Sequence, residues 1–353
     1  MSRSATCIGK LELALELETP CTAVSTTPEG RTFLVYTRID MSKGPSCVEY
    51  KNGTNVAYPN ADAYYSEGKD PATHLLRVNT QRIGPDGSLW LVDVGSPDLG
   101  GLPIMPTGPK LVQVNLTTDS ITRIYSMGNA TLQSSYLDDV RFNPASGKAY
   151  LTDVGSAAII ILDLASGHAI RVLENDTSTL AHSPKSADGH LIRNMDGTLQ
   201  YTPSDQLEVS PDGKWFYYQP ASGAMSRIQT AYLDAAFYNS SMASSLPQLV
   251  EFYALTPGTG GTAIDAEGNI YLGDVDRRLI EKIYPNGTRT VLIQDERLSY
   301  VDAMWVDSRK KLWIPAAQLH LAAAFNNGTD RIRKPIEVFT LDIGVGPSPV
   351  DHV

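Results

Sequence analysis

A tight turn followed by a strand rich in aromatic and β-branched residues occurs six times along this chain, and this repeat constrains the fold more than any other feature. The turns lie at Pro28–Gly30, Pro85–Gly87, Pro144–Gly147, Pro211–Gly213, Ala266–Gly268 and, in degenerate form, Ser308–Lys310. The strands behind them read TFLVYTR, SLWLVDVGS, KAYLTDVGS, KWFYYQPAS, NIYLGDVDR and KLWIPAAQ. Six copies of one such unit indicate a ring of repeats rather than unrelated domains.

Each repeat has room for four strands. A hairpin follows several of the repeated strands, most clearly in LIEKIYPNGTRTVLI, where Asn286-Gly287 is a two-residue turn signal. Successive turns are 42 to 67 residues apart, and no amphipathic helix of ten residues is evident between them, which argues against βαβ units. We therefore predict an all-β fold, in which residues 1–353 form a single six-bladed β-propeller domain with four-stranded antiparallel blades around a central channel.

The two ends of the chain carry strand patterns that can close the ring. Either KLELALELET near the N-terminus or PIEVFTLDI near the C-terminus can complete the last sheet and remove its exposed edge. The tail that contains Pro347 and Pro349 is expected to lie outside the fold.

Charge and hydropathy restrict the partners. The net charge is −10, with no run of Lys and Arg that could neutralise a row of phosphates, so nucleic acid is not expected. The most continuous apolar stretch, Ala157–Leu162, is far too short to cross a bilayer, and no membrane partner is expected. A small molecule is the expected partner, and the sequence does not define an oligomeric state.

Glycosylation motifs point to the secretory pathway. Seven N-x-S/T triplets use half of the 14 asparagines, and they start at Asn52, Asn115, Asn129, Asn175, Asn239, Asn286 and Asn327. We expect a secreted protein whose signal peptide is absent from this sequence, although Asn-Gly-Thr is also ordinary turn chemistry. Cys7, Cys21 and Cys47 allow one intramolecular disulfide at most.

The repeat spacing also selects residues for a site. The cavity end of each innermost strand is expected at Thr22, Asn79, Asp138, Asp205, Gly260 and Asp302. These positions converge on the axis of a propeller, so the three carboxylates should retain at least one proton at neutral pH. The cluster is interpreted as a general acid or a cation site, and the alternative is that the carboxylates cap loop amides.

Other residues complete the predicted site. Tyr136 and Tyr300, each two residues before an aspartate of the cluster, are expected as catalytic pocket walls that stack on a flat ligand. The ligand-binding candidates are Thr22, Asn79, Gln219, Gln318 and His190, and the last lies in a candidate lid over residues 181–203, with His182, Lys185 and Arg193. Asp93 and Asp153 in the repeated DVGS are interpreted as structural, and Arg82, Arg141 and Glu208 as ion pairs between blades.

Three segments carry a family resemblance. They are RIGPDGSLWLVDVGSP, YLDDVRFNPASGKAYLTDVGSAAIIILDLASG and SPDGKWFYYQPASG, and they resemble the Yellow/major royal jelly protein family from about Cys21 to the C-terminus. The resemblance implies a six-bladed propeller, often secreted, that binds small molecules in its central cavity. The chain also looks like fungal Yellow-type proteins of secondary metabolism, including hetero-Diels–Alderases of tropolone-sesquiterpenoid pathways.

Three functions follow as hypotheses. The first is a pathway cyclase without cofactor, which dehydrates a hydroxylated tropolone-like precursor to an o-quinone methide and orients it for hetero-Diels–Alder reaction with a terpene polyene. The second is a non-catalytic Yellow-type protein that binds a small ligand such as a biogenic amine.

The third hypothesis is a metal-dependent lactonase-like hydrolase. The chain is similar to gluconolactonase-type enzymes, and this similarity would place the metal at Thr22, Asp138, Asp205 and Gly260. Only two of these four positions offer a carboxylate, so no metal is predicted.

Overall fold

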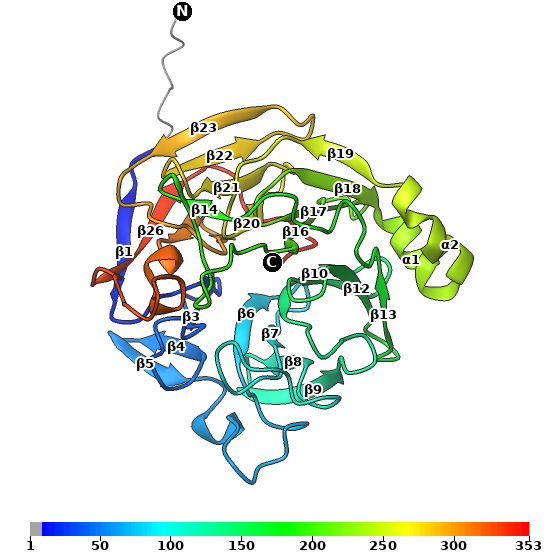
Figure 1. Ribbon diagram of the computed structural model, residues 1–353, viewed down its shortest axis with the longest axis horizontal. Helices are drawn as coiled ribbons and strands as arrows, with labels where there is room; N and C mark the ends of the chain where they lie inside the picture. Colours follow the sequence, from blue (N-terminus) through cyan, green and yellow to red (C-terminus); the bar gives the residue numbers. More distant parts are fainter. Residues whose placement is uncertain (1–8, 353) are drawn as a thin grey trace, which may run out of the picture.

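The computed structural model describes residues 9–352 and arranges six four-stranded antiparallel sheets in a ring (Figure 1). The prediction of a six-bladed β-propeller is confirmed. Blades 1 to 3 comprise β2 (Ala23–Thr26), β3 (Thr32–Val35), β4 (Cys47–Lys51) and β5 (Thr54–Ala57); β6 (Val78–Ile83), β7 (Leu89–Asp93), β8 (Lys110–Asn115) and β9 (Ser120–Ser126); and β10 (Leu137–Asn143), β11 (Lys148–Asp153), β12 (Ala158–Asp163) and β13 (Ala169–Val172).

Blades 4 to 6 continue around the ring. They comprise β16 (Ser204–Val209), β17 (Trp215–Pro220), β18 (Met225–Gln229) and β19 (Glu251–Ala254); β20 (Thr262–Ile264), β21 (Ile270–Asp274), β22 (Leu279–Ile283) and β23 (Arg289–Gln294); and β24 (Trp305–Val306), β25 (Lys311–Pro315), β26 (Ile336–Asp342) and β1 (Glu12–Leu17). Each of the six predicted turns joins the first and second strands of its blade, counted from the channel.

The turn between β6 and β7 shows why these residues recur. Gly87 has φ 73°, which glycine adopts without strain. The Asp86 carboxylate accepts hydrogen bonds from the backbone N–H of Ser88 at 3.1 Å and from the Trp90 indole at 3.0 Å. Trp90 then packs against Phe142 of the next blade, with ring centroids 5.0 Å apart. The turn residues thus fix both the hairpin and the packing between blades.

Both ends of the chain close the ring. The N-terminal β1 is the outermost strand of the sixth sheet and pairs antiparallel with the C-terminal β26, in the order β1-β26-β25-β24. Either segment was expected to complete this sheet, and in the structure both do. The pairing gives hydrogen-bonding partners to a strand edge that would otherwise stay open.

The expectation that the C-terminal tail lies outside the fold is wrong. After β26 the chain returns to the centre of the ring, where the C-terminus lies in Figure 1. Ala266 N–H donates to Gly346 O at 2.9 Å, and Asp351 and His352 are buried. The His352 ring stacks on Trp305 with centroids 3.5 Å apart, and its Nε2 lies 2.7 Å from Val306 O. These polar and aromatic partners hold the tail in the channel, and a pattern of prolines does not reveal them.

Short helices and a small hairpin lie outside the six blades. An insertion between β18 and β19 forms α1 (Thr230–Tyr238), α2 (Ser240–Ser245) and the 3-10 turn η2 (Leu246–Gln248), which the sequence analysis did not foresee. Leu233 and Leu246 bury this insertion against blade 4, and Asn239 caps α2 by accepting from two backbone N–H groups. The remaining short elements are β14 (Ser186–Ala187), β15 (His190–Leu191), η1 (Ala61–Ala63), η3 (Leu319–Leu321) and η4 (Ala323–Phe325).

The cysteines within the described residues are not paired. Cys21 and Cys47 are separate buried thiols, and burial raises the pKa of Cys21 to about 12. Cys7 lies outside the described residues. No helix in the described part of the chain is long and apolar enough to cross a membrane.

Candidate functional site

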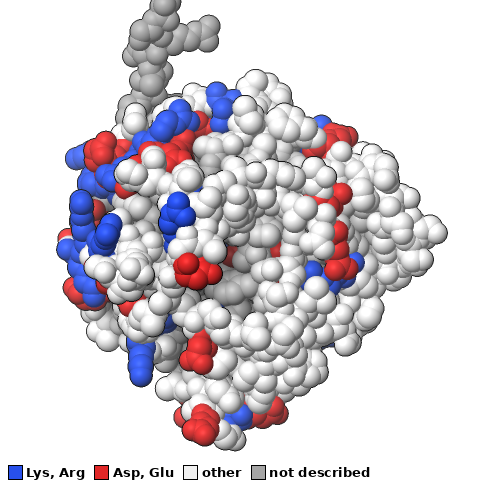
Figure 2. Space-filling view, in the orientation of Figure 1, with Lys and Arg blue, Asp and Glu red and all other residues white. Residues whose placement is uncertain are grey.

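A cavity of about 590 Å³ opens at one end of the central channel. Figure 2 shows the molecule hollowed at the centre of this face. The inner strands contribute Asn79, Asp138 and Asp205 to a polar wall, and the loop before β24 contributes Asp302. The surrounding loops contribute an apolar wall of Ile39, Met41, Leu99, Met195, Leu319 and Phe325. The cavity is therefore amphipathic, with a polar wall at the centre of the ring and an apolar wall contributed by the surrounding loops.

β-Bulges place the polar side chains of three neighbouring blades. The pairing of β6 with β7 shifts register between Val78 and Thr80, and the corresponding shifts lie between Leu137 and Val140 in β10 and between Ser204 and Leu207 in β16. The residues inside the bulges are Asn79, Asp138, Asp139, Asp205 and Gln206, and all five line the cavity. A bulge breaks the alternation of faces, so consecutive polar residues can serve the site.

A hydrogen-bonded chain links Tyr136 to the carboxylates. The Tyr136 hydroxyl donates to Asn79 Oδ1 at 2.9 Å, and Asn79 Nδ2 donates to Asp138 Oδ1 at 2.8 Å. Asp205 is a further side-chain hydrogen-bonding neighbour of Asp138. Two carboxyl groups can share a hydrogen bond only when one of them is protonated. A hydrogen bond between Asp138 and Asp205 therefore requires the pair to retain one proton.

Burial and mutual repulsion favour the protonated forms of these acids. Burial, followed by the charge of Asp205, raises the pKa of Asp138 well above its usual range. Burial also raises the pKa of Asp205, although the Lys185 ammonium opposes this effect. Burial and the Asp205 charge raise the pKa of Asp302 to about 8. At neutral pH the site thus holds protonated carboxyl groups that can act as general acids.

Lys185 and Tyr300 face each other across the cavity wall. The Lys185 ammonium lies 5.4 Å from the centroid of the Tyr300 ring, and both residues line the cavity. Burial alone would lower the pKa of Lys185, but Tyr300 and Asp205 more than offset it, so the pKa is raised and the side chain stays charged. Tyr300 has φ 52°, and its ring also stacks on His320, with centroids 5.6 Å apart.

The cavity gathers most of the predicted site residues. Thr22, Gly260, Tyr136 and Tyr300 line it together with Asn79 and the three aspartates. The predicted lid, residues 181–203, contributes Lys185, Asn194, Met195, Gln200, Tyr201 and Thr202.

Gln219, Gln318 and His190 do not line the cavity. The Gln219 carboxamide accepts from Thr256 Oγ1 at 2.8 Å, and Gln318 exchanges hydrogen bonds with the backbone of Arg333. His190 is exposed on β15. The repeat spacing identifies the strand end on which each residue lies, but side-chain direction depends on the local backbone.

The aspartates of the two DVGS motifs fix the backbone next to the site. Asp153 accepts from Tyr136 N–H at 2.9 Å and forms an ion pair with Arg171 at 2.7 Å. Asp93 accepts from Leu76 N–H at 2.7 Å and pairs with Lys110 at 3.0 Å. Both aspartates hold the loops that lead into the innermost strands, in agreement with their structural interpretation.

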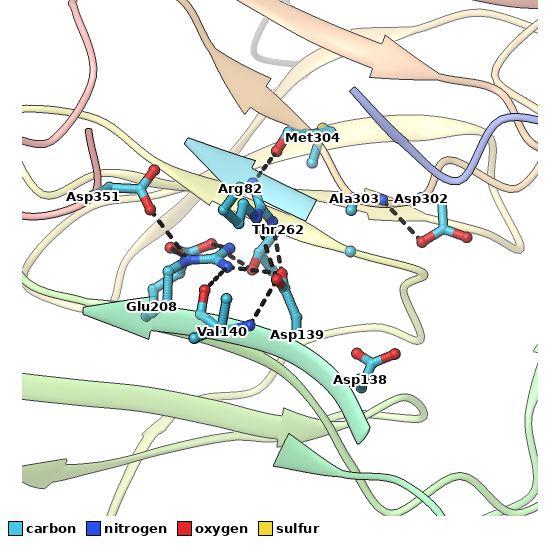
Figure 3. Close-up of polar contacts among 12 residues, drawn as sticks. Arg82, Asp138, Asp139, Val140, Glu208, Thr262, Asp302, Ala303, Met304 and Asp351 are labelled. Carbon is cyan, nitrogen blue, oxygen red and sulfur yellow. Dashed lines mark hydrogen bonds and ion pairs between the residues drawn. The ribbon is translucent and has the colours of Figure 1, made fainter. Parts of the chain in front are cut away.

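An ion-pair cluster lies beside the acids (Figure 3). Arg82 pairs with Asp139 at 2.7 Å and Arg141 pairs with Glu208 at 2.8 Å, which confirms the predicted ion pairs between blades. Asp139 bridges the two arginines. The sequence did not reveal this role, because Asp139 directly follows Asp138 and looks like an ordinary residue of the same strand. Figure 3 shows Asp138 and Asp302 to one side of this cluster, without a line to it.

The residues at the four positions aligned with the metal site of gluconolactonase-type enzymes do not provide a complete set of metal ligands. Of the four aligned positions, Thr22 offers a hydroxyl that already lies 3.4 Å from Val35 O, and Gly260 offers no side chain. Among residues 9–352, no group of three or more His, Cys, Asp or Glu side chains is arranged to hold a metal ion. Hard cations prefer six or more oxygen ligands.

The fold and the cavity together define a propeller that binds or processes small molecules. The chain belongs to the major royal jelly protein family, whose pattern matches residues 80–342, about three quarters of the sequence. No curated protein matches the chain significantly.

Solved structures show the same fold at low identity. A luciferin-regenerating enzyme is 14% identical, covers 98% of this chain and 99% of its own, and superposes with a TM-score of 0.59. The calcium-binding protein regucalcin from Agrobacterium tumefaciens is 14% identical, with 95% of each chain covered and a TM-score of 0.54. A streptogramin B lyase is 9% identical, covers 96% and 99%, and has a TM-score of 0.54. At these identities the likeness concerns the fold alone.

Proposed function

We propose that this protein is a small-molecule pathway cyclase, which dehydrates a hydroxylated tropolone-like precursor to an o-quinone methide and guides its hetero-Diels–Alder reaction with a terpene polyene. The observation that carries the proposal is a set of carboxyl groups, with pKa values raised by burial and mutual repulsion, that line the same cavity as a wall of apolar side chains. Acid groups suit the loss of water, and an apolar wall suits a hydrocarbon partner.

The first step needs one acid and one base. Asp302 donates its proton to the leaving hydroxyl group, the carbon–oxygen bond breaks, and water departs with both bonding electrons. The ring hydroxyl of the precursor loses its proton to the ionised member of the Asp138–Asp205 pair, which leaves a neutral o-quinone methide. Proton transfer from this pair back to Asp302 restores the starting state. General acid–base assistance of this kind contributes about 10²- to 10⁴-fold in rate.

The second step needs orientation rather than a reactive group. The o-quinone methide and an alkene of the polyene form two new σ bonds in the cycloaddition, and no proton or electron is exchanged with the protein. Holding two reactants in the correct geometry can contribute several kcal/mol to lowering the barrier. Met41, Met195 and Phe325 supply flexible and aromatic surface for a polyene beside the polar wall.

The two other hypotheses find less support in the site. An amine ligand would share the cavity with the Lys185 ammonium, which like-charge repulsion disfavours. A metal-dependent lactonase would rely on Thr22 and Gly260 as ligands.

Product formation provides the test. The purified protein is incubated with a hydroxylated tropolone precursor and humulene, and adduct yield and stereochemistry are followed by chiral chromatography with mass spectrometry against a protein-free control. We expect a faster, stereoselective reaction whose rate falls as the pH rises through about 8, because Asp302 then ionises. Asp302→Asn and Asp138→Asn should each lower the rate by about 10²-fold.

The exposed Asp98→Asn variant serves as the matched control and should keep the wild-type rate. A reaction no faster and no more selective than the protein-free control contradicts the proposal. So does full activity in the Asn variants of all three cavity aspartates.

A further inference from the structure

Lys185 brings a positive charge from a loop into a cavity otherwise dominated by acids. It lies in the lid segment, residues 181–203, while the carboxylates belong to the innermost strands and their leading loops. Its backbone is fixed on both sides, because Lys185 N–H donates to Gln200 O at 2.8 Å and Ile192 N–H donates to Lys185 O at 2.9 Å. The ammonium therefore projects from a hydrogen-bonded hairpin rather than from a loose loop.

Blades 5 and 6 anchor this hairpin. Asp188 forms an ion pair with Arg278 at 2.7 Å and lies 2.9 Å from His320 Nε2. The Asp276 carboxylate accepts from Ser186 Oγ and from Gly189 N–H at 2.9 Å. Within the hairpin these contacts use residues 186–189, which directly follow Lys185 in the chain. They hold its position without using its side chain.

The ammonium itself retains hydrogen-bonding capacity. Within residues 9–352 no carboxylate lies at ion-pair distance from Lys185, and its side-chain partner is Tyr300. A lysine ammonium has three N–H donors, so a contact with one phenol leaves donors for another group. A partly buried charge with unused donors is costly unless a ligand or water accepts from it.

The charges around Lys185 define what that acceptor is. Asp205 faces it from β16, and Tyr300 and Asp302 face it from the loop before β24. When Asp138 and Asp205 share one proton, the pair carries one negative charge, which Lys185 balances. An incoming oxygen anion would meet a neutral wall with Lys185 present, and a net negative wall without it.

We infer that Lys185 determines ligand specificity by donating hydrogen bonds from its ammonium group to an anionic oxygen of the ligand, so that the cavity selects oxygen acids and rejects amines. The inference rests on the proposed function and deepens it, since the ring oxygen of the precursor gains negative charge as its proton leaves. In this scheme Lys185 binds the anionic end of the ligand, and the rest of the ligand packs against the apolar wall.

The test measures binding rather than turnover. Isothermal titration calorimetry at pH 6.5 compares three probes that share one ring system and differ in charge: 2-naphthoate, 2-naphthol and 2-naphthylmethylammonium. We expect wild-type protein to bind the carboxylate most tightly. Lys185→Met should weaken carboxylate binding by about 10-fold or more, leave 2-naphthol within about twofold, and improve binding of the ammonium probe.

Two further variants test whether the effect comes from the charge at position 185, rather than from the shape of the side chain or from the net charge of the protein. Lys185→Arg keeps the positive charge and should retain the preference for the carboxylate. Lys282→Met removes a lysine from the outer part of blade 5, where the ammonium lies 5.1 Å from the Tyr284 ring, and should change no affinity. Circular dichroism and thermal unfolding confirm that each variant is folded, and Lys185→Gln replaces Lys185→Met if the latter is not.

Two results would overturn the inference: a carboxylate affinity that is the same in wild-type and Lys185→Met protein, or a wild-type protein that shows no preference for the carboxylate over the ammonium probe. Because no turnover is measured, these outcomes do not depend on the cyclase reaction. Loss of the cyclase proposal with an intact carboxylate preference would leave Lys185 as the specificity residue of a binding protein.

Discussion

Asp138 and Asp139 are consecutive residues of β10, yet the pKa values of their carboxyl groups are shifted in opposite directions. Burial and Asp205 raise the pKa of Asp138 well above its usual range. Burial alone would raise the pKa of Asp139 as well, but Arg141 and Arg82 more than offset it and hold that pKa far below the usual range. The bulge between Leu137 and Val140 makes this division possible, because it releases the two residues from strict alternation.

The two neighbours should therefore respond differently to the same substitution. Asp139→Asn removes the anion that bridges Arg82 and Arg141, and we expect it to lower the free energy of unfolding by about 3 kcal/mol or more. Asp138→Asn removes a proton donor rather than an ion-pair partner, so stability should change by less than about 1 kcal/mol while the cyclase rate falls. Urea unfolding followed by circular dichroism measures both, and equal destabilisation by the two variants would contradict the division.

Asp302 should make stability depend on pH. Its pKa is about 8 in the folded state against 3.8 without the fold, so the folded protein binds more protons than the unfolded chain between these values. Its contribution to stability is fully present below about pH 4 and is lost as the pH rises to about 8. Asp302→Asn, which does not titrate, should match wild type near pH 4 and exceed it by a few kcal/mol near pH 9. Denaturant unfolding at both pH values checks this, with Asp98→Asn as the unchanged control.

The buried tail should contribute measurably to stability. His352→Ala removes the stacking on Trp305 and the contact with Val306 O, and we expect a loss of about 1 to 3 kcal/mol in the free energy of unfolding. The exposed His190→Ala variant should lose almost nothing. Urea titration followed by tryptophan fluorescence compares the two, and indistinguishable midpoints would mean that the tail is only loosely held in the channel.

Glycosylation is expected at Asn286 and Asn115 after expression in a eukaryotic secretory host. Asn286 is exposed in the turn between β22 and β23, and Asn115 lies half-buried at the end of β8, both on outer hairpins. Intact-protein mass should fall on treatment with an N-glycosidase, and Asn286→Gln and Asn115→Gln should each remove one glycan mass. Asn194→Gln, outside any acceptor motif, should leave the mass pattern unchanged. An unaltered mass after glycosidase treatment of wild type would count against secretory passage.

Activity and ligand binding should survive metal chelation. The cavity positions at which gluconolactonase-type enzymes hold a metal are Thr22, Asp138, Asp205 and Gly260 here, and only the two aspartates offer strong ligands. Dialysis against EDTA should leave the product yield and the probe affinities unchanged within error. Loss of function that a single divalent ion restores would reverse this conclusion.

The repeat made the ring and the strand ends predictable, because each turn marks a fixed place in its blade. Counting back from the turns located Asn79, Asp138, Asp205 and Asp302, all of which line the cavity. The same counting placed Gln219 at the cavity end of its strand, although its side chain is bonded to Thr256 in the loops.

The features that the sequence hid depend on three-dimensional contacts. A bulge leaves no signature in one sequence, so the separate role of Asp139 was not visible. The direction of Lys185 depends on the pairing of its hairpin and on the anchoring of Asp188 to Arg278, a residue 90 positions further along the chain. The burial of His352 depends on Trp305, which no local pattern connects with the tail.

The pairing of β1 with β26 cannot form until β26 has been synthesised. Leu17 pairs with Ile336, so β1 waits for a partner that is synthesised 319 residues later. At translation rates of about 5 to 20 residues per second, this delay is roughly 15 to 60 seconds. During that interval the leucine-rich segment LELALEL has an open hydrogen-bonding edge, and a nascent chain in this state is a natural client for a chaperone.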